Sequence, residues 1–383
     1  MNSAHRLCFF FSPIIVGLTG VGCSAWIDEF TMGDGSIGDV DGSMENPGAD
    51  ADTDSDTDTD GDTDTDGDAD TDSDADTDSD ADTDSDADTD GDADTDTDAD
   101  TDDNPVDCEH FISSPADGEI EFCVLKTTSF FMGCDNEIEP SEPCMDDEFP
   151  AHEVETSSFW LQRFEVTGEE FATFIADQPS WNVEGELALD KCNASYLKDW
   201  HDGNPPGGRE LAPALGMCWY AAQAYCKWLG SDFDLPTEAQ WERAARGGND
   251  GHSDKEYWIY TFGNDPSCLL ANYEGCAQRP IDVGSAKGIS PNGIHDLTGN
   301  AWEWVRDWYR EDYYCDPAGE GNYTLPYCDN EFQWNDPVGP DDGAVKILRG
   351  GSWYHSAEMM RSAKRHGTNP SMSSNLAGFR CAR

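Results

Sequence analysis

The chain has 383 residues and a formal net charge of −60, with 81 acidic residues against 21 Lys and Arg. A chain this acidic repels phosphate backbones, so a nucleic-acid partner is not expected. Composition also excludes a folded structure for a long segment, because Asp occupies every even position from 50 to 102 and alternates with Ala, Thr, Ser and Gly. No apolar surface in this tract offsets the chain entropy, and residues 49–106 are therefore predicted to be a disordered, extended linker.

The tract has a second interpretation as a calcium repeat, because "DTDTDG" at 56–61 copies the start of an EF-hand loop. The Glu that would close such a loop at its twelfth position is replaced by Gly67, and no flanking sequence could form the two helices. A solvated spacer is therefore the favoured interpretation, with loose association of counter-ions in either case.

The N-terminus has the features of an export signal. In "HRLCFFFSPIIVGLTGVGC" a weakly basic start precedes an apolar run of about a dozen residues, too short to span a bilayer. Residues 1–22 are predicted to be a signal peptide, followed by a short segment over 23–48. "GVGC" resembles a bacterial lipoprotein cleavage box with Cys23 as the lipidated residue, although Gly20 stands where Leu is commonest. The expected location is the outer membrane or cell surface, held by this lipid anchor alone, and plain secretion is the alternative.

Cysteine counting also favours export. Apart from Cys8 and Cys23, twelve cysteines lie between 108 and 381, an even number that predicts six disulfides in an oxidising compartment. The absence of CxxC and HExxH motifs argues against a zinc site. Proximity suggests five pairs, although connectivity cannot be deduced from sequence: 108 with 123, 134 with 144, 192 with 218, 268 with 276, and 315 with 328.

From position 108 onward, three segments carry helix signals. "TGEEFATFI" begins with a capping box formed by Thr167 and Glu170. "LPTEAQWERAARGG" repeats this pattern with Thr237 and Gln240, and two Gly residues end the helix. Between them, "CWYAAQAYCKWLG" also predicts a helix. The residues expected to face the core are, in chain order, Phe171, Phe174, Ile175, Trp219, Ala222, Tyr225, Cys226, Leu229 and Trp241.

Few helices, many turns and thirteen Trp predict one irregular α+β domain over 107–383, with little regular secondary structure. Seven blocks of this domain resemble, in order, the formylglycine-generating enzyme (sulfatase-modifying factor) family: "FFMGCDN", "FWLQRFEVTGEEFATFI", "CWYAAQAYCKWLGSDFDLPTEAQWERAARGG", "YTFGN", "NGIHDLTGNAWEWVRDWY", "ILRGGSWY" and "SSNLAGFRCA". The resemblance runs from about residue 122 to 383. It implies that family's asymmetric fold, which is related to C-type lectins.

Family enzymes of this type oxidise a Cys in a sulfatase peptide to formylglycine, using O₂ and a copper ion held by two cysteines that follow a Gly-Gly-Ser turn. Here the corresponding segment, "WYHSAEMMRSAKR", is shorter, and no Cys lies between Cys328 and Cys381. A two-thiolate copper site needs two soft ligands, so copper is not expected. His355, Met359 and Met360 are candidates for a replacement metal site, but packing is the favoured role for the two Met residues.

"DLTGNAWEW" matches the family's structural calcium loop, in which a side-chain oxygen, two backbone carbonyls and a Glu bind the ion. These are hard oxygen donors that suit calcium. The ligands that the resemblance implies are Asp296, the carbonyls of Gly299 and Ala301, and Glu303. The alternative is that Glu303 only caps a turn. A second family calcium site would begin at Asn272 and Tyr273, but the segment that completes it, "CAQR", is shortened and lacks the acid.

The family also pairs the Cys of "AYC" with the Cys of "GFRC", which implies a disulfide between Cys226 and Cys381. What remains of its peptide groove would contain Ser352, His355, Asn375 and Arg380. The adjoining Trp353 and Tyr354 are as consistent with the core as with a ligand-facing position, Arg380 beside a disulfide is more often structural, and the extra Ala377 displaces the groove floor relative to the family pattern.

The C-terminal segment has a local positive balance, because Glu358 is its only acidic side chain from Arg349 to the C-terminus. Two interpretations of Arg361, Lys364 and Arg365 are open. The favoured one is that they neutralise acids elsewhere in the domain, and the other is that they line a groove for an anionic ligand.

Two classes of function follow. The favoured one is an exported binding or scaffold module that kept the fold and lost the oxidase, with structural calcium and with a peptide, glycan or cell-envelope fragment as ligand. The alternative is an enzyme of the wider superfamily that uses residues other than cysteine, because superfamily members in other oxidative pathways lack the two cysteines. The scattered His residues place no Ser-His-Asp triad.

Overall fold

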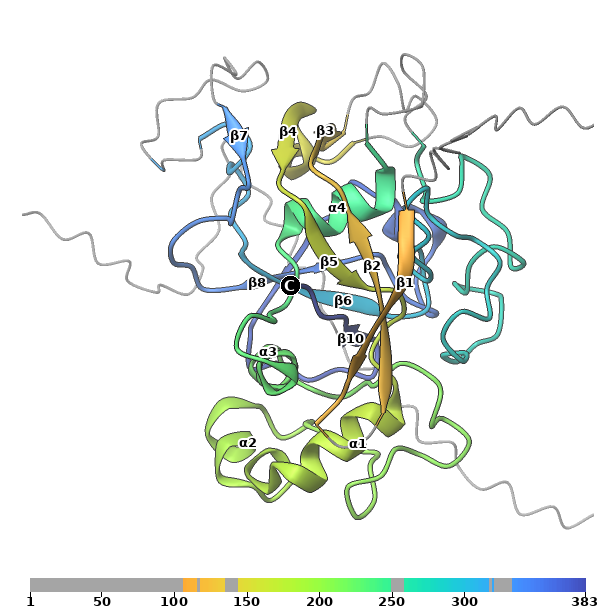
Figure 1. The fold of residues 1–383 in the computed structure, drawn as a ribbon, viewed down its shortest axis with the longest axis vertical. Coiled ribbons are helices and arrows are strands. Elements are labelled where there is room, and N and C mark those ends of the chain that lie inside the picture. The colour runs from red at the N-terminus through yellow and green to blue at the C-terminus, as the bar shows by residue number, and fades with distance from the viewer. Residues whose placement is uncertain (1–105, 116–117, 135–143, 249–257, 317–318, 320–332) are drawn as a thin grey trace, which may run out of the picture. The chain divides into compact units, whose positions relative to one another are not determined.

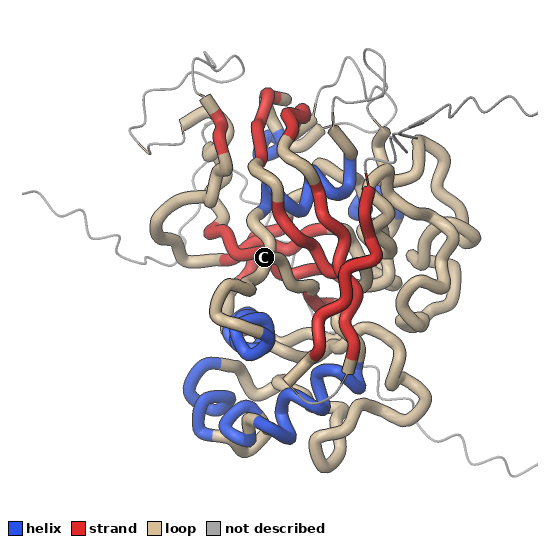
Figure 2. Tube along the Cα trace, in the orientation of Figure 1, coloured by secondary structure: helices blue, strands red, loops and turns tan. Residues whose placement is uncertain are grey.

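The computed structural model describes residues 106–115, 118–134, 144–248, 258–316, 319 and 333–383. The signal peptide, Cys23 and the Asp-rich tract lie outside these residues, so what the sequence predicts for them stays a prediction. In the described part, short strands and helices are joined by long loops (Figure 1, Figure 2). The predicted fold class, α+β with little regular secondary structure, is confirmed.

The strands form three small sheets, with the orders β1-β2-β5, β10-β6-β8-β9 and β3-β4-β7. Pairing is antiparallel except between β10 and β6 and between β4 and β7, which are parallel. The strand bounds are β1 Val106–Ser113, β2 Glu119–Leu125, β3 Thr128–Met132, β4 His152–Thr156, β5 Phe159–Gln162, β6 Trp302–Trp308, β7 Trp334–Asn335, β8 Lys346–Arg349, β9 His366–Thr368 and β10 Ala377–Phe379.

Helices α1 and α4 begin where their capping signals predict. Thr167 and Glu170 form the capping box of α1, and Thr237 and Gln240 form that of α4. The predicted core-facing residues are buried, except that Leu229 at the end of α3 is partly exposed. The helix bounds are α1 Gly168–Asp177, α2 Glu186–Lys191, α3 Trp219–Leu229 and α4 Glu238–Arg246, with 3-10 helices η1 Asp146–Glu148, η2 Pro179–Trp181 and η3 Ala357–Met360.

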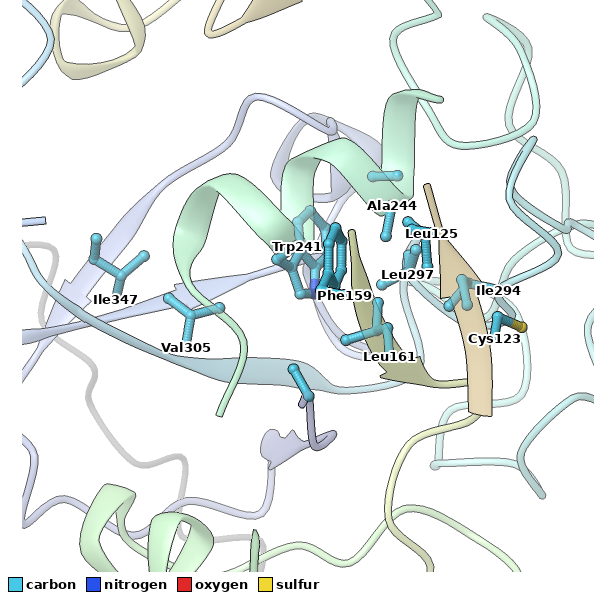
Figure 3. Packing of buried hydrophobic residues seen from close by; sticks show 12 residues of the cluster. Cys123, Leu125, Phe159, Leu161, Trp241, Ala244, Ile294, Leu297, Val305 and Ile347 are labelled. Carbon is cyan, nitrogen blue, oxygen red and sulfur yellow. The ribbon is translucent and has the colours of Figure 1, made fainter. Parts of the chain in front are cut away.

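Helix α4 is enclosed by packing on two sides. Trp241 lies in one apolar cluster with Phe159 and Leu161 of β5 and Val305 of β6 (Figure 3). Ala239 belongs to a second cluster, formed with side chains of β3, β4 and β7. Almost the whole helix is therefore removed from water, including its charged residues, and a buried carboxylate needs a counter-charge to remain ionised.

The C-terminal basic residues supply this counter-charge. Arg349 donates to Glu238 at 2.9 Å and to Glu242 at 2.5 Å, and Arg365 donates to Glu238 through two N–H groups at 2.8 and 3.0 Å. All four side chains are at most 2% exposed. Burial alone would raise the pKa of Glu238, but Arg365 and Arg349 outweigh it and hold this pKa below its usual value.

A second buried ion pair joins the same segment to η1. Arg361 donates twice to Glu148, at 2.7 and 2.8 Å, and Lys364 lies 3.9 Å from the same carboxylate. The neutralising role predicted for the basic segment is confirmed. The alternative, that it lines a groove, is wrong for Arg361 and Arg365, because both are almost completely buried.

Disulfides add a covalent frame. The family-implied pair Cys226–Cys381 and four of the pairs suggested by proximity are present: Cys108–Cys123, Cys134–Cys144, Cys192–Cys218 and Cys268–Cys276. Cys315 is also disulfide-bonded, while its predicted partner Cys328 lies outside the described residues. So many disulfides indicate an oxidising compartment outside the cytosol. Of the helices that the structure describes, none has the length and apolar character to cross a bilayer.

Candidate functional site

A glycine turn after β8 positions the segment where the family carries its copper ligands. Gly350 and Gly351 have φ angles of 91° and 75°, in the left-handed region that favours glycine. A Cβ on Gly351 would lie 2.8 Å from the carbonyl oxygen of Met359, so no larger residue fits. The turn also holds the predicted calcium loop, because the Gly299 N–H donates to the Gly350 carbonyl at 2.8 Å.

Beyond the turn, Ser352, His355 and Trp302 form a hydrogen-bonded group. Ser352 Oγ lies 2.7 Å from Nδ1 of His355, and Trp302 Nε1 donates to the same nitrogen at 3.2 Å. Because the indole N–H can only donate, Nδ1 is an acceptor and therefore carries no proton. Burial lowers the pKa of His355, which agrees with a neutral ring. Sequence reasoning missed Trp302, whose part depends on a contact between residues 53 positions apart.

Two of the four predicted groove residues, His355 and Asn375, reach the surface here, and a third, Ser352, is buried. Trp353 Nε1 donates to the Asn375 carbonyl at 3.4 Å, which joins the Ser352–His355 segment to the loop before β10. Asn375 is exposed and Tyr354 is 62% exposed, whereas Ser352 is buried beneath them. Tyr354 is therefore exposed to solvent and is not a core residue. We call the surface formed by residues 353–355 and Asn375, with Ser352 buried beneath it, the turn surface.

Arg380, the fourth predicted groove residue, does not reach the turn surface. It is fully buried and donates to both carboxylate oxygens of Glu303 at 2.7 Å. Its remaining N–H groups donate to backbone carbonyls of residues 162, 163 and 295. Placing Arg380 in the groove is therefore corrected: its charge neutralises a buried acid and all its donors are used.

The hydrogen bonds between Arg380 and Glu303 also affect whether the predicted loop could bind calcium. Asp296 fits a hard cation, because it is 4% exposed and its Oδ1 has no hydrogen-bond partner. Glu303 does not fit as placed, since its oxygens accept from Arg380 and Trp241. Within the described ranges, no three His, Cys, Asp or Glu side chains form a metal-binding group. Calcium at this loop remains a prediction, and it requires Glu303 to release Arg380.

A buried acid that sequence reasoning left unassigned lies beside this loop. Glu165 accepts hydrogen bonds from the side chain of Asn300 at 2.7 Å and from the backbone N–H of Ala301 at 3.1 Å. Burial raises the pKa of Glu165 well above its usual value, and the nearby Asp296 and Glu303 raise it further. The three buried carboxylates Glu165, Asp296 and Glu303 thus lie near Arg380. Protonation of one of them, or binding of a cation, would reduce the electrostatic repulsion between them.

At the second predicted calcium site, the side chain of Asn272 is used in hydrogen bonds within the protein. Asn272 is 2% exposed, and its side-chain oxygen accepts from the Ala277 N–H at 3.3 Å. Its amide donates to the carbonyl of Arg279 and to Asn300. Tyr273 packs against an apolar cluster that contains Met360. Met360 therefore has the packing role that was favoured for it.

For calcium, we expect chelation to lower the melting temperature of the wild-type chain by about 5–10 °C, if calcium is present at about 100 times its dissociation constant. The variant Asp296→Ala, which removes the unpartnered oxygen, should show no such shift. Glu303→Gln is a poor probe, because it would leave Arg380 buried without its counter-charge whether or not calcium binds. Differential scanning calorimetry with and without EDTA measures the shift, and an equal shift in both proteins would exclude Asp296 as a ligand.

The small sheets, the long loops and the glycine turn that carries Ser352 define a domain of the formylglycine-generating enzyme type. The chain belongs to the family described as "Sulfatase-modifying factor enzyme 1-like domain", whose model matches residues 112–383.

Relatives of this chain have several different names. The serine/threonine-protein kinase Pkn1 of Chlamydia trachomatis serovar L2 is 32% identical over 243 residues, which cover 62% of this chain and 35% of the kinase. The formylglycine-generating enzyme of Streptomyces coelicolor is 30% identical over 273 residues, covering 62% of this chain and 82% of the enzyme. The hercynine oxygenase of Mycolicibacterium smegmatis is 29% identical over 270 residues, covering 66% of this chain and 59% of the oxygenase. The chain thus spans about a third of the length of the kinase.

Two solved structures show the same fold. PvdO from Pseudomonas aeruginosa has a TM-score of 0.53 at 21% identity, covering 72% of this chain and 98% of PvdO. Variable protein 1 of Treponema denticola has a TM-score of 0.52 at 20% identity, covering 71% and 98%. At these identities the likeness concerns the fold alone.

Proposed function

We propose that this domain is a ligand-binding module of its superfamily and not a copper oxidase. The observation that carries the proposal is the chemistry of the segment after the glycine turn, which has Ser352 and His355 and no cysteine. All eleven cysteines of the described residues are disulfide-bonded, so none of these offers a free thiolate. A linear copper site of the family's kind needs two such thiolates.

The turn surface supports binding for a second reason. Its exposed aromatic residue, Tyr354, extends from a backbone that is fixed by the glycine turn and by hydrogen bonds from Ser352, Trp353 and His355. An aromatic side chain on a fixed backbone loses little conformational entropy when a ligand covers it. The proposed ligands are a peptide, a glycan or a cell-envelope fragment.

Tethering completes this proposal. A lipid on Cys23 would anchor the chain, and the Asp-rich tract would act as a spacer that holds the domain away from the membrane. Calcium bound near Asp296 would be structural, because this loop packs behind the turn through the Gly299–Gly350 hydrogen bond.

One observation favours the second candidate, an enzyme that works without cysteine. The neutral His355 ring lies within hydrogen-bond distance of the Ser352 hydroxyl, which is the arrangement of a general base and its proton donor. Against this, Ser352 is 0% exposed and the same nitrogen also accepts from Trp302. Binding is therefore the better supported function.

Tyr354→Ala tests the binding proposal. We expect labelled full-length chain to bind at least one probe on an array of peptides, oligosaccharides and cell-wall fragments, and Tyr354→Ala to weaken that binding about tenfold or more. Phe111→Ala, which removes an exposed aromatic residue from β1, is the matched control and should bind normally. Binding that survives Tyr354→Ala unchanged, or no binding to any probe, would exclude the turn surface as the ligand site.

A further inference from the structure

A hollow of about 220 Å³ lies between α2 and α3, on elements that do not contribute to the turn surface. We call it the helix groove. Its walls come from η2, α2 and α3, and its lining includes Trp181, Leu187, Lys191, Tyr220, Gln223 and Lys227. This is smaller than the typical pocket for a drug-sized ligand, so it suits a single ring-sized group.

The walls of the helix groove are fixed before any ligand arrives. The disulfide Cys192–Cys218 joins the residue that follows α2 to the residue that precedes α3. The hydroxyl of Tyr196 donates to the Trp181 carbonyl at 2.7 Å, which holds η2 against the same unit. Rigid walls reduce the entropy lost on binding, and this disulfide limits the movement of α2 relative to α3.

The lining combines flat apolar rings with positive charge. Trp181 and Tyr220 are partly exposed, and the Lys191 ammonium lies 5.9 Å from the centre of the Tyr220 ring. Leu187 extends the apolar wall and is 37% exposed. Aromatic faces bind the C–H faces of sugar rings, whereas ammonium groups at the rim bind carboxylates.

The two ammonium groups are available to an anion. Lys191 pairs with Asp190 and Lys227 pairs with Asp234, each at 2.9 Å, and both lysine side chains are about 45% exposed. Exposed pairs of this kind contribute little, so exchanging an Asp for a ligand carboxylate costs little free energy. Each ammonium also has three N–H donors, so it keeps donors for a ligand carboxylate beyond the one that its Asp accepts.

A peptide fits the helix groove less well than a sugar. All of its lining residues are on helices, so the groove offers no strand to which a peptide backbone could add. Gln223 is the only side-chain amide among these residues, and its N–H already donates to Asp234 at 3.0 Å. We propose that the helix groove binds one acidic sugar residue of an oligosaccharide, with Trp181 and Tyr220 against its ring and Lys191 and Lys227 on its carboxylate.

Isothermal titration calorimetry on the full chain tests this assignment with three probes: a galacturonic acid tetramer, the neutral maltotetraose and a tetraglutamate peptide. We expect the galacturonic acid tetramer to bind tightest. Lys191→Gln and Lys227→Gln should each weaken its binding about threefold, and the double variant about tenfold. Tyr220→Ala should weaken it about tenfold as well.

Two matched controls locate the binding. Lys198→Gln removes an exposed lysine outside the groove, and Phe111→Ala removes an exposed aromatic residue from β1; neither should affect binding of the tetramer. The lysine variants change exposed side chains, so they are expected to fold normally. The assignment is overturned if the tetramer does not bind, if the peptide binds as tightly, or if the paired lysine variants bind like wild type. If Tyr354→Ala weakens binding of the tetramer, the sugar binds at the turn surface, and the assignment to the helix groove is overturned.

Discussion

We expect Glu238→Gln to lower the free energy of unfolding by about 3–5 kcal/mol at neutral pH, the typical cost of breaking a buried ion pair from one side. Glu238 accepts three of the hydrogen bonds that Arg349 and Arg365 donate. Replacing its carboxylate by a neutral amide therefore leaves the buried charges of both guanidinium groups without their full counter-charge. Urea unfolding of wild type and variant, followed by tryptophan fluorescence, measures the loss.

The dependence of this loss on pH has a definite sign. The pKa of folded Glu238 is below the ordinary Glu value of 4.5, so its stabilisation is fully present above about pH 4.5 and is lost as pH falls through the folded pKa. The free energies of unfolding of wild type and variant should therefore become similar as the pH falls into the acid range. The matched control is Asp232→Asn, which breaks the exposed pair with Arg383 and should cost less than about 1 kcal/mol. Equal losses in both variants would show that burial adds nothing to the Glu238 pairs.

The second large effect concerns the disulfide with the widest span. Replacing Cys226 and Cys381 together by Ala should lower the free energy of unfolding by about 5 kcal/mol, because this bond closes a loop of 155 residues. The same change at Cys268 and Cys276, which close a loop of 8 residues, should cost about 2.5 kcal/mol. Calorimetry of both double variants compares them, and a larger loss at the short loop would contradict loop closure as the source of the stability.

Local sequence signals are sufficient to predict α1, α3 and α4, but not the short α2, whose N-cap residue Gly185 has no side chain to form a capping hydrogen bond. The capping boxes at Thr167 and Thr237 each depend on residues three positions apart, and both form as predicted. The glycine turn is similarly local, because its two positive φ angles are set within "RGGSW". Leu229 differs from its prediction because α3 ends there, where Gly230 leaves the last turn partly exposed.

The partners of the buried charged residues could not be predicted, because these contacts join residues that are distant in the sequence. The motif that implied calcium named Glu303, but nothing local to that motif indicates that Arg380, 77 positions later, binds both of its oxygens. The counter-charges of the C-terminal basic residues likewise come from α4 and η1, more than 100 positions earlier. A basic segment in an acidic chain predicts neutralisation, but the partners require the fold.

The central claim of the proposed function is that this domain does not oxidise cysteine, since residues 353–365, which follow the Gly-Gly-Ser turn where the family has its two cysteines, contain none. The most direct measurement is the aldehyde formed when the copper-loaded chain is incubated in air with a cysteine-containing sulfatase peptide, detected by aldehyde-specific labelling. A copper-only blank and the formylglycine-generating enzyme of Streptomyces coelicolor are the negative and positive controls. We predict labelling at the level of the blank, and labelling above it would contradict the claim.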